Sequence, residues 1–188
     1  RFPETAAIIS NFDEITRQVQ DLKGVKVLVT AGGTREAIDP VRFIGNRSSG
    51  KQGIAVANAA KNRGAQVQLI AANCDVSGLT GMDVIEVETT LEMQNALRAN
   101  FSSCNILVMS AAVADARPLQ VSDQKIKKSS LESIELQQNP DLLAELSPNK
   151  GDRILVGFAA ETREHLQEAR RKLEAKGLDV ICVNDVSG

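Results

Sequence analysis

Residues 25–34 have the sequence VKVLVTAGGT, a continuous apolar run that ends in two glycines. A run without alternation between apolar and polar residues is typical of a strand that is buried on both faces of a parallel sheet. Three further runs have the same character, at residues 105–110, 153–158 and 179–184. Residues 66–70 and 84–87 are expected to add two more strands.

Helical patterns separate these strands, at residues 50–63, 91–100, 141–146 and 162–176. Thr162 is expected to cap the start of the last helix, and Gly177 follows its end. The alternation of strands and helices predicts an α/β fold with a Rossmann-like, doubly wound and mostly parallel sheet.

Two segments fall outside this alternation. Residues 3–20 carry apolar side chains at spacings of four, three and four, at Ile8, Phe12, Ile15 and Val19. This stripe predicts an amphipathic helix outside the sheet, either a linker or a partner surface. Residues 116–138 contain a proline and closely spaced lysines and predict an extended excursion, either a functional lid or a disordered segment.

The composition excludes several classes of protein. The 188 residues include 22 Lys and Arg against 24 Asp and Glu, and 43% of them are hydrophobic. A net charge near zero, with 3% aromatic residues, argues against a nucleic-acid partner. The apolar runs are far shorter than the roughly 20 residues of a membrane span. Three cysteines without metal-binding spacing favour a reducing compartment, so we expect a cytoplasmic protein without a membrane partner.

The turn after the first strand contains Gly32, Gly33 and Thr34. Paired glycines let the backbone approach a ligand and point amides at an anion, although a turn without a ligand would use them too. The dinucleotide fingerprint G-x-G-x-x-G is absent, and residues 71–73 are AAN rather than an acid that would bind a ribose. A nicotinamide cofactor is therefore disfavoured.

Residues 45–52, GNRSSGKQ, resemble a phosphate-binding P-loop without matching it. Gln52 replaces the hydroxyl residue that would hold magnesium, and the segment does not follow the strand directly. Ser48, Ser49 and Gly50 nevertheless precede a predicted helix, whose N-terminus favours a phosphate. The alternative is a simple serine N-cap.

Small residues also follow two other strands, at residues 110–115 (SAAVAD) and 157–162 (GFAAET). They leave room for a flat base or a sugar, and Asp115 is a candidate ligand for a ribose hydroxyl or a metal. Close packing of strand and helix explains the same pattern, with Phe158 in the core. The lysines of residues 125–128 lie on the excursion, where solvated charge is the plain alternative to phosphate binding.

Taken together, seven motifs in one order resemble the phosphopantothenoylcysteine synthetase family. They are AGGTRE (31–36), DPVRF (39–43), NRSSGKQG (46–53), AAVAD (111–115), KIKK (125–128), GFAAET (157–162) and NDVS (184–187). The resemblance covers residues 24–188, which it implies to be a synthetase domain whose C-terminal segment is missing. Residues 1–23 resemble the linker that follows a flavin-dependent decarboxylase domain, which binds FMN and is absent from this chain.

The resemblance implies a ligase that joins 4'-phosphopantothenate to L-cysteine. CTP would activate the carboxylate as an acyl-cytidylate with release of pyrophosphate, and the cysteine amine would then displace CMP. The family is Mg-dependent and dimeric, so a homodimer is expected.

The resemblance also implies roles for individual residues. Asn46 matches the residue that converts the acyl-cytidylate into product, and Lys125 matches the lysine that promotes its formation. Asp115 is the candidate metal ligand. The candidate contacts to the nucleotide or its phosphates are Gly32, Gly33, Thr34, Ser48, Ser49, Gly50, Ser110, Ala111, Ala112, Asp115, Lys125, Phe158, Ala159, Ala160 and Glu161.

Three other functions compete with the ligase. The chain would also suit a non-catalytic nucleotide-binding module or, given the missing fingerprint, much less well an NAD(P)-binding oxidoreductase. A fragment that oligomerises through its N-terminal helix is the third alternative.

Overall fold

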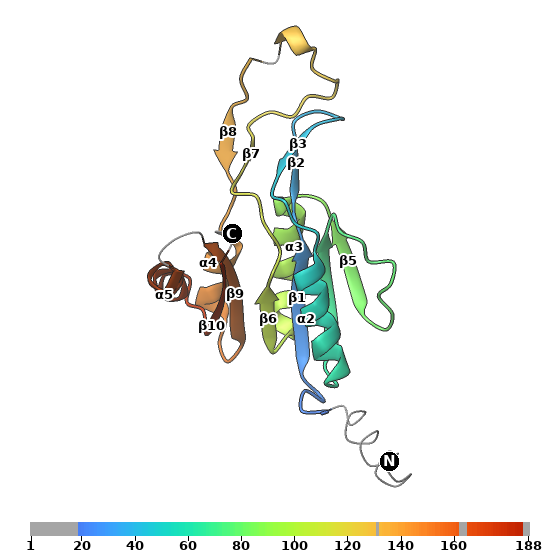
Figure 1. The fold of residues 1–188 in the computed structure, drawn as a ribbon, viewed down its shortest axis with the longest axis vertical. Coiled ribbons are helices and arrows are strands. Elements are labelled where there is room, and N and C mark those ends of the chain that lie inside the picture. The colour runs from blue at the N-terminus through green and yellow to red at the C-terminus, as the bar shows by residue number, and fades with distance from the viewer. Residues whose placement is uncertain (1–18, 131, 162–164, 186–188) are drawn as a thin grey trace, which may run out of the picture.

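The computed structural model describes residues 19–130, 132–161 and 165–185, and the helix expected at residues 3–20 lies almost entirely outside them. The centre of the molecule is a six-stranded parallel sheet with the order β10-β9-β6-β1-β4-β5 (Figure 1). Its strands are β1 (Lys26–Gly32), β4 (Gln66–Ala72), β5 (Asp83–Val87), β6 (Ile106–Met109), β9 (Ile154–Glu161) and β10 (Val180–Asp185). Numbered along the chain within this sheet, the order is 6-5-4-1-2-3. This is the order of a Rossmann sheet, which confirms the predicted fold class.

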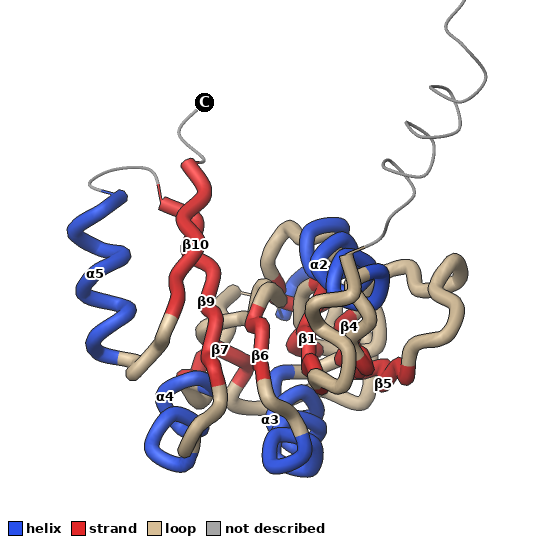
Figure 2. Tube along the Cα trace, turned by 90° about the horizontal axis from the view of Figure 1, so that it is seen from below, coloured by secondary structure: helices blue, strands red, loops and turns tan. Residues whose placement is uncertain are grey.

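Helices cover both faces of the sheet. Figure 2 shows α2 (Lys51–Asn62) on one face, with α3 (Thr90–Asn100) and α4 (Leu142–Leu146) on the other. The remaining helix of the described residues, α5 (His165–Ala175), lies beside the edge strand β10. Short 3-10 turns are η1 (Phe101–Ser103), η2 (Lys128–Ser130) and η3 (Ser147–Asn149).

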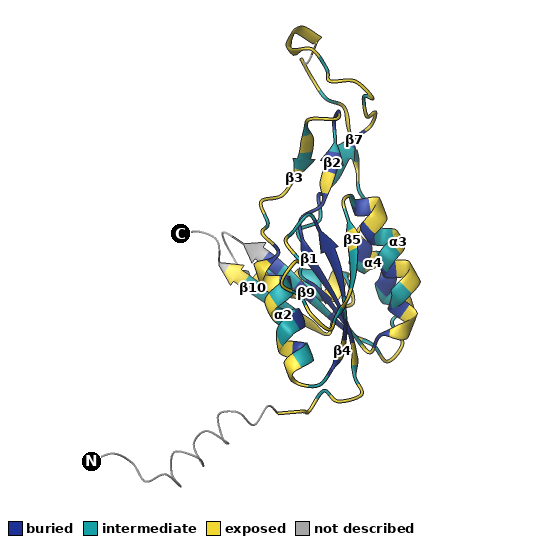
Figure 3. Cartoon of the chain, turned by 90° about the vertical axis from the view of Figure 1, so that its right-hand side faces the viewer, coloured by how far each residue is buried: buried dark blue, intermediate teal, exposed yellow. Residues whose placement is uncertain are grey.

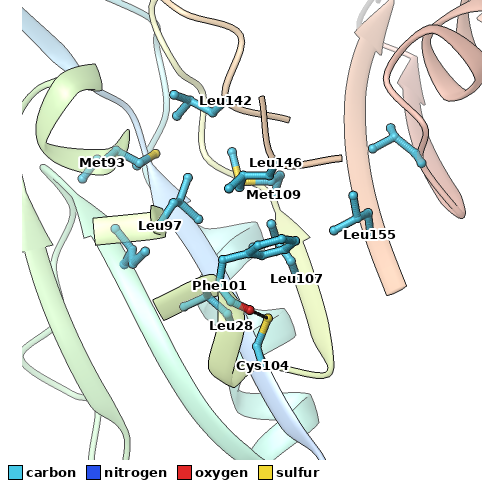
Figure 4. Close-up of a cluster of buried hydrophobic side chains, with 13 residues drawn as sticks. Leu28, Met93, Leu97, Phe101, Cys104, Leu107, Met109, Leu142, Leu146 and Leu155 are labelled. Carbon is cyan, nitrogen blue, oxygen red and sulfur yellow. Dashed lines mark hydrogen bonds between the residues drawn. The ribbon is translucent and has the colours of Figure 1, made fainter. Parts of the chain in front are cut away.

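The central strand β1 sends its side chains into two cores. Leu28 packs with α3 and α4 in a cluster that includes Leu97 and Leu146 (Figure 4). Val27 and Val29 pack on the opposite face, against Ala57 and other residues of α2 and β4. Both faces are apolar because both are covered, which explains why this strand shows no alternation in the sequence.

Two antiparallel hairpins stand outside the sheet. The first consists of β2 (Arg35–Ala37) and β3 (Phe43–Gly45) and separates β1 from α2. The second pairs β7 (Ala116–Pro118) with β8 (Leu136–Gln138) and forms the stem of the excursion, which we call the lid (residues 116–138). Figure 3 shows that the lid is largely exposed and rises from the same end of the sheet as the first hairpin. The predicted excursion therefore has regular structure at its base, where β7 and β8 pair.

The helix starts differ in part from expectation. Thr89 caps α3 and forms a capping box with Glu92, which stabilises that helix locally. In contrast, the N-cap of α2 is Gly50, in the left-handed conformation at φ 75°, and no side chain among the described residues caps this helix. The simple serine cap considered for residues 48–50 is therefore wrong. The cap expected from Thr162 falls outside the described residues.

None of the described helices is long and apolar enough to span a membrane. Cys74, Cys104 and Cys182 are free thiols, and Cys104 is buried in the core as a small apolar residue.

Candidate functional site

A cavity of about 830 Å³ lies beyond the carboxyl ends of β6 and β9. It is lined by residues 46–48, Gln52, 109–115, 138–143, Phe158, Ala159, Lys172, Lys176 and Asn184. The neighbouring strands β1 and β6 continue into connections that run in opposite directions along the sheet. Ligands of doubly wound sheets bind at this switch point, because the loops diverge there and leave a crevice.

The N-terminus of α2 forms one wall of a second cavity of about 290 Å³. Residues 47–53 line this cavity, and both cavities share Arg47, Ser48, Gln52 and Ser110, so they form one crevice. Because no side chain caps α2, its first amides and the positive end of its dipole are available to an anion. Glycine is needed at position 50 for close packing, since a Cβ there would lie 2.7 Å from the Cβ of Cys74.

Ser110 lies where the two cavities meet. Its Oγ is buried and has no hydrogen-bond partner within the described part of the chain. A buried hydroxyl without a partner costs free energy, so a ligand in the crevice would satisfy it. Across the crevice, the Asn184 side-chain amide donates to Gln52 Oε1 at 3.1 Å and joins the end of β10 to α2.

Asn46 lies at the wall of the larger cavity, as expected for a residue that contacts substrate. Its Nδ2 donates to the carbonyl oxygen of Val113 at 3.0 Å. This bond orients the side-chain amide, which can donate or accept a hydrogen bond and does not gain or lose a proton near neutral pH. Asn46 is therefore suited to orienting a substrate or an oxyanion rather than to transferring a proton.

Two lysines face the cavity, Lys172 from α5 and Lys176 from the turn that follows this helix. Lys172 and Lys176 are one helical turn apart, and both line the cavity. Lys176 Nζ lies 2.9 Å from Asp141 Oδ2, and Asp141 caps α4 by accepting from the backbone amide of Ala144. Burial raises the pKa of Asp141, but the hydrogen bonds from Lys176 and the Ala144 amide outweigh it and lower the pKa overall. Two lysines thus lie on the α4–α5 side of the crevice, and an ion pair with Asp141 holds one of them in place.

The glycine turn after β1 does not line the crevice, contrary to expectation. The amide of Gly33 donates to Ala72 O at 3.0 Å, and that of Thr34 donates to Ala112 O at 3.3 Å. Gly32 has φ 84°, and a Cβ there would lie 1.8 Å from Ala72 O. The turn needs its glycines for close packing beneath residues 46–48, so Gly32, Gly33 and Thr34 support the site from below.

The other predicted contacts divide into three groups. Ser48, Ser110, Ala111, Ala112, Asp115, Phe158 and Ala159 line the larger cavity, and Ser49 and Gly50 line the smaller one. Ala160 and Glu161 continue β9, but their side chains lie outside the described part of the structure. Lys125 is exposed on the lid and does not line either cavity.

Asp115 is an exposed carboxylate at the cavity wall. Among the described residues, no group of three His, Cys, Asp or Glu side chains is arranged to hold a metal. A metal at Asp115 would therefore need ligands from a bound substrate.

The lid is anchored to the first hairpin by Asp39, which is 3% exposed. Asp39 Oδ2 accepts from the backbone amide of Ile126 at 3.1 Å, and the Arg42 guanidinium donates to Ile126 O at 2.7 Å. Hydrogen bonds from Arg42 hold the pKa of Asp39 well below its usual range, helped by the backbone amides of Val41, Ile126 and Arg42 itself. Asp39 and Arg42 together fix the residue next to Lys125.

The sequence did not predict part of the cavity wall. This part consists of residues 138–143, Lys172 and Lys176. Lysines four residues apart on a strongly charged helix are ordinary surface residues until the packing of α5 beside α4 is known. The spacing of the two lysines was the available signal, since it places both on one face of the helix.

Comparison with known proteins gives a consistent result. Residues 22–188 match the family model described as the DNA/pantothenate metabolism flavoprotein C-terminal domain. The coenzyme A biosynthesis bifunctional protein CoaBC of Mycolicibacterium smegmatis is 49% identical over 181 residues, which cover 88% of this chain and 43% of that protein. CoaBC of Haemophilus influenzae is 46% identical over 190 residues, which cover 100% of this chain and 48% of that protein. The chain thus spans less than half the length of these curated relatives.

Solved structures show the same fold. The crystal structure of the C-terminal domain of a CoaBC protein has a TM-score of 0.79 at 38% identity, and the match covers 87% of this chain and 79% of that chain. A Cab2 mutant in complex with phosphopantothenate-cysteine has a TM-score of 0.75 at 18% identity, with 98% of this chain and 81% of that chain covered. At 18% identity, the second match supports the fold alone.

Proposed function

Since the chain belongs to the family of DNA/pantothenate metabolism flavoprotein C-terminal domains, we propose that it is the ligase part of a coenzyme A biosynthesis protein. In the proposed reaction, the carboxylate of 4'-phosphopantothenate attacks the α-phosphorus of CTP, and pyrophosphate leaves. The amine of L-cysteine then attacks the activated carbonyl carbon, and CMP leaves as the amide forms and the amine loses a proton.

The observation that carries this proposal is a single crevice with an anion-binding feature at each end. The uncapped N-terminus of α2 lies at one end, and Lys172 and Lys176 lie on the α4–α5 side. The two phosphorylated substrates of the ligase need such an arrangement, because their phosphates must be held apart while the carboxylate meets the α-phosphorus. We assign the triphosphate to the lysine side and the phosphate of phosphopantothenate to α2.

Asn46 and Lys125 take the two chemical roles. Asn46, already oriented by Val113 O, would hydrogen-bond the acyl group or the oxyanion that forms when the amine attacks. Lys125, carried by the lid, would stabilise the charge that accumulates on the triphosphate. Closure of the lid over the site would also keep water from the acyl-cytidylate.

Magnesium fits the site in one specific way. Mg²⁺ is usually held by one or two carboxylates together with substrate phosphates, and Asp115 offers one carboxylate at the cavity wall. The ion would neutralise charge on the triphosphate. FMN belongs to the decarboxylase half of the bifunctional relatives, with which we expect this domain to be joined, and we expect the domain to form a homodimer.

Release of pyrophosphate tests this function and the choice of nucleotide. We expect pyrophosphate only when phosphopantothenate, magnesium and a nucleotide are all present, with CTP clearly preferred to ATP, GTP and UTP. The assay should use the chain alone and the chain at the full length of its bifunctional relatives. Equal or better use of ATP would refute the choice of CTP. Tight nucleotide binding without pyrophosphate in either protein would identify a binding module instead.

A further inference from the structure

A chain of buried polar side chains runs beneath the stem of the lid. Thr34 and Thr90 are 0% exposed and Glu36 is 3% exposed, which is unusual for residues of these types. Glu36 Oε1 accepts a hydrogen bond from the Thr90 amide at 2.9 Å and another from the Thr90 hydroxyl at 2.7 Å. None of these three residues lines the crevice.

The carboxylate of Glu36 sets the direction of the hydrogen bond between the two threonine hydroxyls. The Thr90 hydroxyl gives its only hydrogen to Glu36, so Thr90 Oγ1 must accept from its other partners. Those partners are the Thr34 hydroxyl at 3.1 Å and Asn139 Nδ2 at 3.1 Å. Thr34 Oγ1 in turn accepts from the amide of Ala114 at 2.9 Å. One carboxylate thus orders hydrogen bonds that end on residues of the crevice wall.

Asn139 joins both sides of the lid stem. Its Nδ2 also donates to Ala114 O at 2.8 Å, and its backbone amide donates to Asp115 O at 2.8 Å. The polypeptide leaves the body of the protein after Asp115 and returns at Asn139. Ala116 pairs with Gln138 at the foot of the stem. Ala114, Asp115 and Asn139 all line the crevice. The buried chain therefore connects Glu36 to the wall of the site and to the base of the lid.

Capping of α3 explains only part of why a carboxylate is buried here. The capping box of Thr89 and Glu92 leaves the amide of Thr90, the first residue of α3, to Glu36. Burial of a carboxylate is costly unless its hydrogen bonds are made. Beyond the Thr90 amide, Glu36 also accepts from the Thr90 hydroxyl and so orients the oxygen that accepts from Asn139.

We propose that Glu36 and Thr90 are positioning residues for the ligase reaction: they hold Asn139 and the segment of Ala114 and Asp115 where the nucleotide binds and the lid is hinged. This inference rests on the proposed function, which it deepens. Loss of these buried hydrogen bonds should displace the crevice wall and weaken nucleotide binding.

The test compares three substitutions at adjacent positions. Thr90→Val removes the hydroxyl and keeps the shape, so Asn139 and Thr34 lose their acceptor. Leaving buried polar groups unpaired should raise the KM for CTP by roughly tenfold. Thr90→Ser keeps the hydroxyl and should stay within about twofold of the unsubstituted protein. Thr89→Val, the matched control, weakens the cap of α3 and should lower the thermal midpoint without changing this KM.

Amide hydrogen exchange gives a second readout that does not depend on activity. Exchange in residues 114–118 and 136–140 should be faster in Thr90→Val than in Thr89→Val. If the unsubstituted protein releases no pyrophosphate, the proposed function fails. The positioning role of Glu36 and Thr90 is then tested by amide hydrogen exchange alone. If Thr90→Val does not fold, Glu36→Gln replaces it, with a smaller change in the same direction. Equal KM values and equal exchange in the Thr89 and Thr90 variants would overturn the inference.

Discussion

Asn46 and Lys125 lie in different parts of the molecule, and we expect them to serve different half-reactions. Asn46 is part of the cavity wall, whereas Lys125 is carried by the exposed lid. Lys125→Gln should lower the rate of acyl-cytidylate formation by about 10²-fold or more, as for one preorganised electrostatic donor. Asn46→Asp should let the intermediate form and then accumulate, because an anion beside the acyl group opposes attack by the amine. Quenched-flow analysis with labelled CTP separates the two outcomes.

Lys127→Gln is the control for this comparison, since Lys127 lies on the other side of Ile126 on the same lid. It should leave the rates of both half-reactions within about threefold of the unsubstituted protein. This change is much smaller than the loss of about 10²-fold expected when one electrostatic donor is removed. If the Asn46 and Lys125 variants both accumulate the intermediate, or if neither does, the division of roles is wrong even where ligation is observed.

At single positions, the sequence predicted many of the residues that line the crevice, but it did not predict how the backbone amides after β1 are used. Ser48, Ser110 and Phe158 line the cavity as predicted. The predicted ligand amides of Gly33 and Thr34 are instead used inside the fold. Glycine at a strand end allows close packing as well as approach of a ligand, and only the position of Ala72 shows that packing requires Gly32 here.

Among the elements, the buried carboxylate of Asp39 helps to anchor the lid to the first hairpin. Asp39→Asn places an amide where Oδ2 now accepts from Ile126 and Arg42. Loss of these bonds should release the lid, and trypsin should cleave it after Lys125, Lys127 or Lys128 roughly tenfold faster at neutral pH. Asp123→Asn removes an exposed carboxylate of the same lid and should not change the rate. Equal rates for both variants would contradict the anchor.

The pH dependence of the anchor follows from the direction of the Asp39 pKa shift. Arg42 and the backbone amides lower this pKa in the folded protein, so the anchoring bonds are fully present above the unfolded value of about 4. They are lost only as the pH falls below that value and through the lower folded pKa. Cleavage of the unsubstituted lid, measured with an acid-active protease, should therefore rise only in strongly acidic solution.

The strands of the central sheet and the helices around it, including α4 with five residues, were predictable, whereas the hairpin of β2 and β3 was not. The six strands of the sheet and the helix at residues 91–100 follow from continuous apolar runs and helical spacing. The hairpin of β2 and β3 has strands of three residues each, too short to show any periodicity. Its role in anchoring the lid depends on contacts between residues 39 and 126, which lie far apart in the chain.

At the scale of the whole molecule, strand order creates the site. The pattern of strands and helices predicted a doubly wound sheet, and adjacency of β1, β6 and β9 brings residues 46–53, 109–115 and 158–159 to one crevice. The lysine side of the crevice was not predictable, because it exists only once α5 packs near α4. The fold class therefore followed from local pattern, whereas the charge distribution of the site required tertiary structure.

Transfer of oxygen from substrate to nucleotide tests the central claim most directly. Phosphopantothenate labelled with ¹⁸O in both carboxylate oxygens is incubated with CTP, magnesium, L-cysteine and the ligase, and the CMP is analysed by mass spectrometry. Because the carboxylate attacks the α-phosphorus and its oxygen leaves with CMP, we expect one ¹⁸O atom in each CMP and the other in the amide product. Unlabelled CMP formed along with the amide would contradict an acyl-cytidylate and the reaction proposed for this crevice.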